Sequence, residues 1–427
     1  MFGFLTRGEP APAANWTTPQ DSEQPKLPLM EGIALVVGVF FWLGSYLGMV
    51  GVLVPARIAE IDPEAKATAL AAMSAIAMVV STIANILEGA WSDRTRSRFG
   101  RRTPWLYFGS IGAAICIYFW GTADSIAAII AWDAIYMIFL NAIVAPLIAV
   151  LSDRVAPRHR GTISSMYAIG MSAGNYGGQI LAAFFIGVNE TNGVILMAVM
   201  ALLSGPLASV FLREKSTIGM PVEKLTLKNL SENFAFPLKD CRDYYLALIG
   251  KVCVVSAQFT VAGYQLYILT DYIGLSDSES ASYISYISTI LMVSAIILSL
   301  ISGPIADRMH WRKWPVVISS LLMAIGCIIP SFAPNANLML VYALVAGLGY
   351  GIFSSLDQAL NIDVLPNMKT AAKDLGILNI ANNGGQVIGP VLSGIIIATA
   401  GYDYVFHLGC GLALMGAILL ACIKKVH

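Results

Sequence analysis

Charged residues are scarce in this chain. Asp, Glu, Lys and Arg make up 12% of its 427 residues, against roughly 25% in an ordinary soluble domain. Hydrophobic residues make up 57%. The scarcity of charge excludes an ordinary soluble protein and indicates a membrane protein. Because the formal net charge is zero and the isoelectric point is near 6.9, the overall charge predicts no nucleic-acid partner.

Several kinds of chemistry lack their usual sequence patterns. The six cysteines form no C-x-x-C pair, so no disulfide framework is expected. The four histidines are scattered, which argues against a metal centre. The phosphate-binding pattern G-x-x-x-x-G-K-[ST] is missing, so ATP is not expected to drive the protein. We therefore expect no metal, no cofactor and no enzymatic activity.

Long apolar runs fill most of the sequence. A helix needs about 20 apolar residues to cross a bilayer. The predicted spans are 31–54, 68–90, 105–122, 126–150, 162–187, 193–211, 245–269, 281–302, 314–332, 338–360, 375–399 and 404–423. We therefore expect an all-α membrane protein with twelve transmembrane helices and both termini on one side.

Lysine and arginine are unevenly divided between the two sets of alternate loops. All but three of the 26 fall in the set that includes both tails. The exceptions are Arg57 and Lys66 in the opposite set and Lys251 inside a span. Because basic loops stay on the cytoplasmic side, both termini are predicted to be cytoplasmic, and the expected location is the cell membrane.

These patterns also divide the chain into domains. Residues 1–28 are polar and rich in proline, which predicts a flexible cytoplasmic tail. Residues 29–212 form the first predicted six-helix bundle, 213–243 a cytoplasmic linker, and 244–427 the second bundle. Nothing in the sequence indicates an oligomer, so a monomer is expected.

Two sequence repeats relate the predicted bundles. The first copy of one motif is Gly89, Asp93, Arg94, Gly100, Arg101 and Arg102, and its second copy is Gly303, Asp307, Arg308, Arg312 and Lys313. A second repeat matches SAGNYGGQI at 172–180 with NIANNGGQV at 379–387. Internal repeats predict two pseudo-symmetric bundles, and this arrangement is typical of alternating-access carriers with a site between the halves.

The turn G-x-x-x-D-R followed by G-R-R resembles the loop motif of the major facilitator superfamily. The longer form SDRTRSRFGRRTPW is similar to that of the glycoside-pentoside-hexuronide:cation and sucrose:proton symporters. This resemblance implies a secondary transporter whose motif residues act as a cytoplasmic gate. The alternative is that Asp93 and Arg94 only cap a helix and anchor a short loop.

Polar residues recur on single faces of the predicted helices. The stripes comprise Ser74, Ser81, Asn85 and Glu88; Ser165, Ser172, Asn175 and Gln179; and Asn379, Asn382 and Gln386. Polar groups are costly in hydrocarbon, so the stripes predict a shared aqueous cavity. The alternative is that these amides bond across packed helices, with neighbouring glycines permitting close approach.

A combination of aromatic and amide residues favours a sugar as the solute. Aromatic rings cover the apolar face of a sugar while amides and carboxylates bond its hydroxyls. Besides Asn175, Gln179, Asn379, Asn382 and Gln386, the candidate binding residues are Trp42, Tyr46, Asn141, Gln258, Tyr264 and Gln265. Each aromatic residue alone is also consistent with a structural role.

Three acids are candidates for proton coupling. Asp133 ranks first because it lies eight residues into a predicted span without a basic neighbour in sequence, and Glu88 and Asp357 follow. In the glycoside symporters, the resemblance places two helix-two acids at the positions of Ser81 and Asn85. Because neither residue is acidic here, proton coupling is expected over sodium coupling.

The sequence therefore predicts a proton-coupled symporter of a sugar or glycoside that works by alternating access. Its expected partners are the solute, protons and the bilayer. Two alternatives stay open: an exporter of drugs or other small solutes by proton antiport, and a non-transporting sensor on the same fold.

Overall fold

The structure, a computed structural model, describes residues 19–220, 241–309, 313–365 and 371–424, and no strand occurs among them. The first half comprises α1 (Leu29–Gly48), η1 (Met49–Leu53), α2 (Val54–Ile61), α3 (Lys66–Arg94), α4 (Thr103–Gly121), α5 (Ile126–Arg154), η2 (Pro157–His159), α6 (Arg160–Ala183) and α7 (Glu190–Leu212). The second half comprises α9 (Arg242–Ala262), α10 (Gln265–Tyr267), η3 (Ile268–Tyr272), α11 (Asp277–Met309), α12 (Lys313–Ile328), η4 (Ile329–Phe332), α13 (Ala336–Asp363), α14 (Ala371–Ala400) and α15 (Asp403–Ala421).

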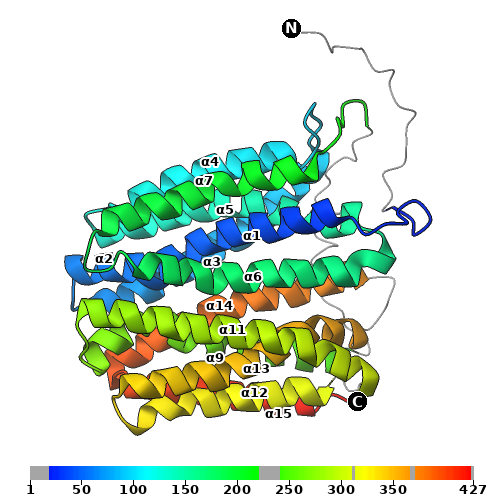
Figure 1. The fold of residues 1–427 in the computed structure, drawn as a ribbon. Helices are drawn as coiled ribbons and strands as arrows, with labels where there is room; N and C mark the ends of the chain where they lie inside the picture. The colour runs from blue at the N-terminus through cyan, green and yellow to red at the C-terminus, as the bar shows by residue number, and fades with distance from the viewer. Residues whose placement is uncertain (1–18, 221–240, 310–312, 366–370, 425–427) are drawn as a thin grey trace.

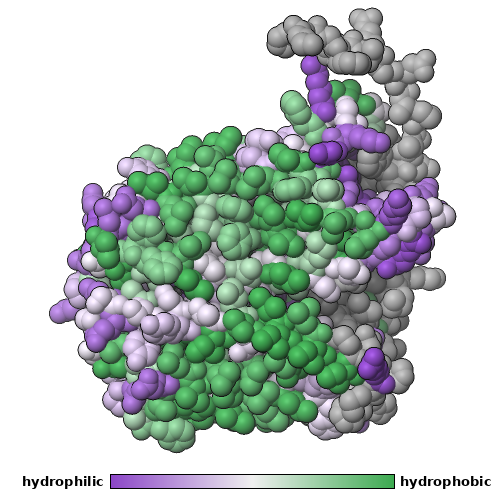
Figure 2. Space-filling model, viewed as in Figure 1, coloured by the Kyte–Doolittle hydropathy of each residue, from purple (hydrophilic) through white to green (hydrophobic). Residues whose placement is uncertain are grey.

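The long helices run side by side, and both ends of the described chain lie at one end of the molecule (Figure 1). We call this the terminus end and the opposite one, which carries α2, the far end. Ten helices among the described residues are long and apolar enough to cross a membrane. Figure 2 shows a hydrophobic middle with hydrophilic residues gathered toward both ends, as a bilayer requires.

Two further long helices, α4 and α6, lie at predicted spans but are not among those ten. The α6 sequence carries the polar stripe and five glycines, which lower its hydropathy. The α4 sequence mixes aliphatic residues with tyrosines, tryptophans and glycines. The ten helices establish a multi-pass membrane protein, while the count of twelve stays a prediction.

The two halves pack in the same way. In the first half, α1 packs on α6 and α7, while α5 packs on α3 and α4. In the second half, α9 packs on α14 and α15, while α13 packs on α11 and α12. Between the halves, α3 packs against α14 and α6 against α11. The two halves therefore share one packing pattern, as the sequence repeats predict, and each offers its second and fifth long helices to the other.

The first long helix of each half is irregular toward the far end. The π-helical turn η1 follows α1 directly, and η3 follows the break after α9 and the short α10. A π turn adds a residue to the helical turn and often marks a functional site. The first helices of both halves thus reach the far end through irregular backbone.

At the far end the two halves are joined by polar contacts. The Lys66 ammonium of α3 lies 2.5 Å from the Asp271 carboxylate of η3 in the other half, and Asp271 also accepts from the Tyr402 hydroxyl of its own half at 2.7 Å. The Tyr264 hydroxyl donates to the Ala67 carbonyl at 2.9 Å, and Tyr267 donates to the Pro55 carbonyl at 2.8 Å. The structure therefore shows the far end closed, held by what we call the far-end latch.

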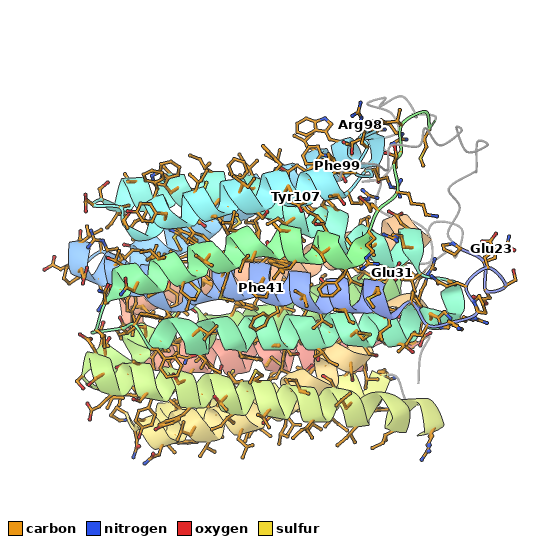
Figure 3. The ribbon with its side chains drawn as sticks, turned by 45° about the horizontal axis from the view of Figure 1, so that its top comes forward. Glu23, Glu31, Phe41, Arg98, Phe99 and Tyr107 are labelled. Atoms are coloured by element: carbon orange, nitrogen blue, oxygen red, sulfur yellow. The ribbon has the colours of Figure 1, made fainter. Side chains whose placement is uncertain are left out.

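The described part of the predicted N-terminal tail lies against the loop between α5 and α6. The Gln24 amide donates to the Arg154 carbonyl at 3.1 Å and accepts from the Ala156 N–H at 2.8 Å. Close by, Glu31 at the start of α1 forms an ion pair with Arg154 at 3.1 Å. Figure 3 shows Glu23 and Glu31 together at the terminus end.

Candidate functional site

Aromatic side chains join α1 to α5, although these helices pack mainly on other neighbours. The Tyr46 ring of α1 stacks on Tyr136 of α5 with centroids 5.8 Å apart, and Trp120 of α4 lies 5.5 Å from Tyr136. Asp133, one turn before Tyr136, is buried and lies near both tyrosines. With Trp42, one turn before Tyr46, these residues form what we call the N-seam cluster.

Three polar atoms of the N-seam cluster are buried without a partner. They are Oδ1 of Asp133 and the indole Nε1 atoms of Trp42 and Trp120, none of which makes a hydrogen bond within the described part of the chain. A buried polar group without a partner costs about 1–3 kcal/mol. A carboxylate acceptor and two donors in one cluster suit a ligand group that both donates and accepts, as a hydroxyl does.

The second half joins its first and fourth long helices with an ion pair. The Lys251 ammonium of α9 donates to Asp357 of α13 at 2.6 Å, and the two side chains are only 3% and 10% exposed. The Asn361 amide also donates to Asp357, at 3.0 Å. We call these three residues the C-seam triad. The sequence analysis assigned no role to Lys251. The usable signal was that Lys251 is the one basic residue inside a predicted span.

The two halves also meet at the centre of the molecule, between α6 and α13. Tyr176 of α6 meets Tyr350 of α13 edge to face, with ring centroids 6.5 Å apart. The Gln258 amide of α9 lies close to both hydroxyls, and the Tyr176 hydroxyl makes no regular hydrogen bond among the described residues. Of the predicted binding residues, Gln258 is thus placed where the halves meet. Tyr176 and Tyr350 were missed because rings inside spans are common.

The polar stripe of α3 lies against α5. The Asn85 amide donates to Asn141 at 3.0 Å, and Asn141 donates to the Ser81 hydroxyl at 2.9 Å. Glu88, one turn beyond Asn85, is 2% exposed, and its Oε2 has no partner in the described region. Helical spacing predicted the shared face correctly, but Asn141 and Asn85 here bond to each other within one half.

The stripes on α6 and α14 lie beside closely packed glycines. The Gln179 amide donates to the Asn175 carbonyl on its own helix at 3.0 Å, and both residues are buried. On α14, Asn382 and Gln386 are half-buried. An ideal Cβ on Gly178 would lie 2.0 Å from the Gly44 carbonyl oxygen of α1. These helices therefore use glycine for close packing on one side of each stripe.

Two predicted binding residues lie at the far end. Tyr264 is one of the hydroxyl donors of the far-end latch described above. Gln265 is 3% exposed, and its Nε2 atom is unpaired within the described residues. The structure thus places these side chains near the closed end and away from the centre where Gln258 lies.

The repeated motif of the first half forms a network at the terminus end. The Arg102 guanidinium lies 2.6 Å from Asp93 and 2.8 Å from Asp153, and it donates to the Ser92 hydroxyl at 2.9 Å. Arg101 also pairs with Asp153, at 2.5 Å. These bonds tie α3, α4 and α5 together inside one half. This geometry matches the anchoring alternative for the motif.

Two further motif residues are explained by local geometry. Arg94 donates to the Ala90 carbonyl one turn earlier at 2.7 Å. Gly100 has φ of +95°, and an ideal Cβ there would lie 2.4 Å from the Glu214 side chain. Glu214 in turn accepts from the backbone N–H groups of Arg102 and Thr103 at 2.9 and 2.8 Å, which caps α4. Figure 3 shows Arg98 and Phe99 projecting from this loop.

Of the other motif residues, the structure describes the surroundings of only some. Gly89 faces Ala145 of α5 at van der Waals distance, and Arg308 at the end of α11 is exposed. Lys313 donates to the Ile423 carbonyl at 3.0 Å. Arg312 lies outside the described residues, as do the side chains of Asp307 and Asn379 and the surroundings of Gly303.

Comparison with known proteins agrees with this architecture. The chain is 25% identical over 125 residues to the MFS-type transporter gkaD of Penicillium citrinum, which covers 29% of this chain and 21% of that protein. It is 24% identical over 148 residues to the multidrug efflux pump SdrM of Staphylococcus aureus, and the match covers 34% of this chain and 32% of that protein. The chain thus spans about a third or less of these relatives. A bacterial homologue of the human lysosomal transporter Spinster, solved inward-facing and unoccupied, matches 93% of this chain and 95% of its own with a TM-score of 0.65 and 14% identity.

Two pseudo-symmetric helical halves with buried polar seams define a two-bundle, multi-pass membrane protein, and neither the fold nor the family is that of an enzyme. The model of the Major Facilitator Superfamily matches residues 34–233 and 246–426. The chain belongs to the major facilitator superfamily.

Proposed function

We propose that the protein is a proton-coupled symporter of a polyhydroxylated solute such as a sugar or glycoside, and that it works by alternating access. The observation that carries the proposal is the unpaired oxygen of Asp133 among aromatic rings and unpaired indole donors. A sugar hydroxyl can accept from an indole and donate to a carboxylate at once. The rings supply the apolar surface that such a solute also needs.

Asp133 is the best candidate for the coupling group among the three acids. The charge of Asp357 is already balanced by the buried Lys251 ammonium 2.6 Å away. Asp133 has no such cation among its described neighbours, so a proton is the simplest way to neutralise it in the membrane interior. Glu88 shares this feature but lies along the α3–α5 stripe, away from the aromatic rings. It is the second candidate.

Uptake by reconstituted protein tests this proposal. In proteoliposomes with an imposed pH gradient, a panel of labelled sugars and glycosides should include one that the wild type accumulates. Asp133→Asn should lose gradient-driven accumulation yet keep exchange between preloaded vesicles and the medium, because exchange needs no net proton movement. Asp124→Asn is the matched control, since Asp124 lies two residues before α5 and is almost fully exposed. Full accumulation by Asp133→Asn would rule out its coupling role.

Export by proton antiport is the second candidate function. Its support is the similarity to SdrM, whose name records multidrug efflux. The same vesicles distinguish symport from antiport, because a proton antiporter moves a dye in the direction opposite to the proton flow. Dye extrusion without accumulation of any sugar or glycoside would favour the exporter.

For the repeated motif we propose a gate role at the terminus end, which we take to be cytoplasmic in the cell membrane. Support comes from the exposed position of Asp93, whose carboxylate is 55% exposed beside its partner Arg102. In another access state the same carboxylate can bond the opposite half, and Arg102 keeps a second partner in Asp153 meanwhile.

A further inference from the structure

The C-seam triad places a positive charge deep inside the second half. Lys251 lies nine residues after the start of α9, about 13 Å along a helix that rises 1.5 Å per residue. A charged side chain at this depth is costly and is usually functional. The ion pair also bridges α9 and α13, which pack mainly on different neighbours. The ion pair is therefore not needed to hold α9 or α13 against its main packing partners.

The Lys251 ammonium has N–H donors for which the described residues supply no acceptor. An ammonium group has three N–H donors, but within the described residues only Asp357 accepts from it. Asp357, in contrast, also has the Asn361 amide, which would stay bonded to it if the lysine moved away. The triad is thus built so that the carboxylate can lose its cation and still keep one hydrogen bond.

The triad faces the centre of the molecule. Gln258 follows Lys251 by two turns on α9, and Tyr350 precedes Asp357 by two turns on α13, so each pair shares a helix face. Gln258 and Tyr350 are the side chains that meet Tyr176 of the opposite half. A solute between the halves would therefore have the ammonium two helical turns from it.

We propose that the transported solute carries a carboxylate and that Lys251 binds this group, with Asp357 holding the ammonium until the solute arrives. This inference rests on the proposed function and deepens it, because the polyhydroxylated solute becomes a polyhydroxy acid. Its hydroxyls meet the N-seam cluster, and its carboxylate takes the place of Asp357 at Lys251.

Charge balance links this exchange to proton uptake. The empty Lys251–Asp357 pair is neutral, whereas a bound carboxylate adds one negative charge to a buried site. A proton that enters with the solute restores neutrality, and an unpaired buried charge would otherwise be strongly unfavourable. The described charged or titratable groups around Asp357 are Lys251 of α9 and Tyr350 of α13. On α11, the hydroxyls of Ser299 and Ser302 bond the neighbouring serines Ser354 and Ser355 of α13.

Gluconate and sorbitol are matched probes, because both are six-carbon polyols and only gluconate has a carboxylate. Calorimetric titration of the purified full-length protein should show gluconate binding about tenfold or more tighter than sorbitol, which is the effect of one charged hydrogen bond. The double variant Lys251→Met/Asp357→Asn removes both charges, so it leaves no buried acid unpaired. Its gluconate affinity should fall to that of sorbitol, while Lys251→Arg should keep a preference for gluconate.

Lys66→Met is the control, since Lys66 also pairs with an acid but at the far end, and it should leave the ratio of the two affinities unchanged. Equal affinities in the wild type, or a full gluconate preference in the double variant, would overturn the carboxylate site. If gluconate preference depends on Lys251 while Asp133→Asn still accumulates solute, the carboxylate site stands and the assigned coupling group fails. Absence of binding by both probes overturns the polyhydroxy acid as substrate.

Discussion

Gly100 shows how one residue fixes the conformation of the basic turn between α3 and α4. Its φ of +95° is a conformation that other residues adopt at a cost, and its Cα faces the Glu214 side chain. Gly100→Ala should therefore lower the thermal unfolding midpoint, with a loss of about 1–3 kcal/mol from strain and overpacking. Tryptophan fluorescence during heating in detergent measures this.

Gly219→Ala separates the two causes. Gly219 also has a positive φ, +88°, but nothing lies within 4 Å of its ideal Cβ. The Gly219 variant should show backbone strain alone and unfold at a higher temperature than Gly100→Ala. If the two variants unfold together, the contact with Glu214 contributes nothing to the stability of the turn.

At this scale the sequence showed which residues were unusual but not what they touch. Lys251 and Asp357 are far apart in the chain, and their pairing depends on how α9 lies beside α13, which no local pattern records. Asp133 was recognisable because an acid without a cation in a span is rare. The neighbouring Trp120 and Tyr136 could not be recognised in the sequence, because aromatic residues are common in membrane spans.

Whole helices illustrate what residue spacing can and cannot predict. Spacings of three, four and seven identify a common face, and Ser81 and Asn85 do share one facing α5. Spacing does not say which helix covers that face. The amides there bond Asn141 of the same half, so a stripe of this kind is compatible with packing as well as with a cavity.

Gly178 tests how far α6 depends on close approach to α1. Gly178→Ala should force the helices apart, since the added carbon would lie 2.0 Å from a backbone oxygen that cannot rotate away. We expect a loss of stability of about 1–3 kcal/mol and reduced uptake. Gly177→Ala is the control one residue away, where the nearest atom is a ring carbon of Phe40 at 3.3 Å. Equal stability of both variants would contradict this account of the α1–α6 contact.

The far-end latch acts at the scale of the whole molecule. Asp271 binds both Lys66 and Tyr402, so Asp271→Ala should weaken the closed far end. Partly exposed ion pairs contribute up to about 1 kcal/mol, or roughly a fivefold change in a conformational ratio. To measure this, nitroxide labels are placed on Glu60→Cys and Ser278→Cys in a background without the six native cysteines. The Asp271→Ala variant should show a larger share of long label-to-label distances than the protein with Asp271.

Tyr272→Phe serves as the control for that measurement, because Tyr272 bonds Asp403 within the second half. Its distance distribution should match the unsubstituted protein. If Asp271→Ala also leaves the distribution unchanged, then the tyrosine bonds to Ala67 and Pro55 hold the far end closed without the ion pair.

Membrane insertion and the two-half organisation could be predicted from run length and repeats, because both follow from the bilayer's thickness and from residue identity alone. The family match confirms that prediction. The access state could not be predicted, since both states of a carrier share one sequence and differ by a few contacts such as those of Tyr264 and Tyr267.

The exchange of second and fifth helices between the halves has one more consequence. Contacts α3–α14 and α6–α11 are the same contact made twice, in reversed roles, which is the geometry of a self-complementary interface between identical subunits with two-fold symmetry. Two identical six-helix units with such a surface would form both contacts at once when they meet. Joining two such units in one chain requires no new interface, so each half is free to carry a different seam. The first half has an acid without a described partner, and the second has an acid paired with a lysine.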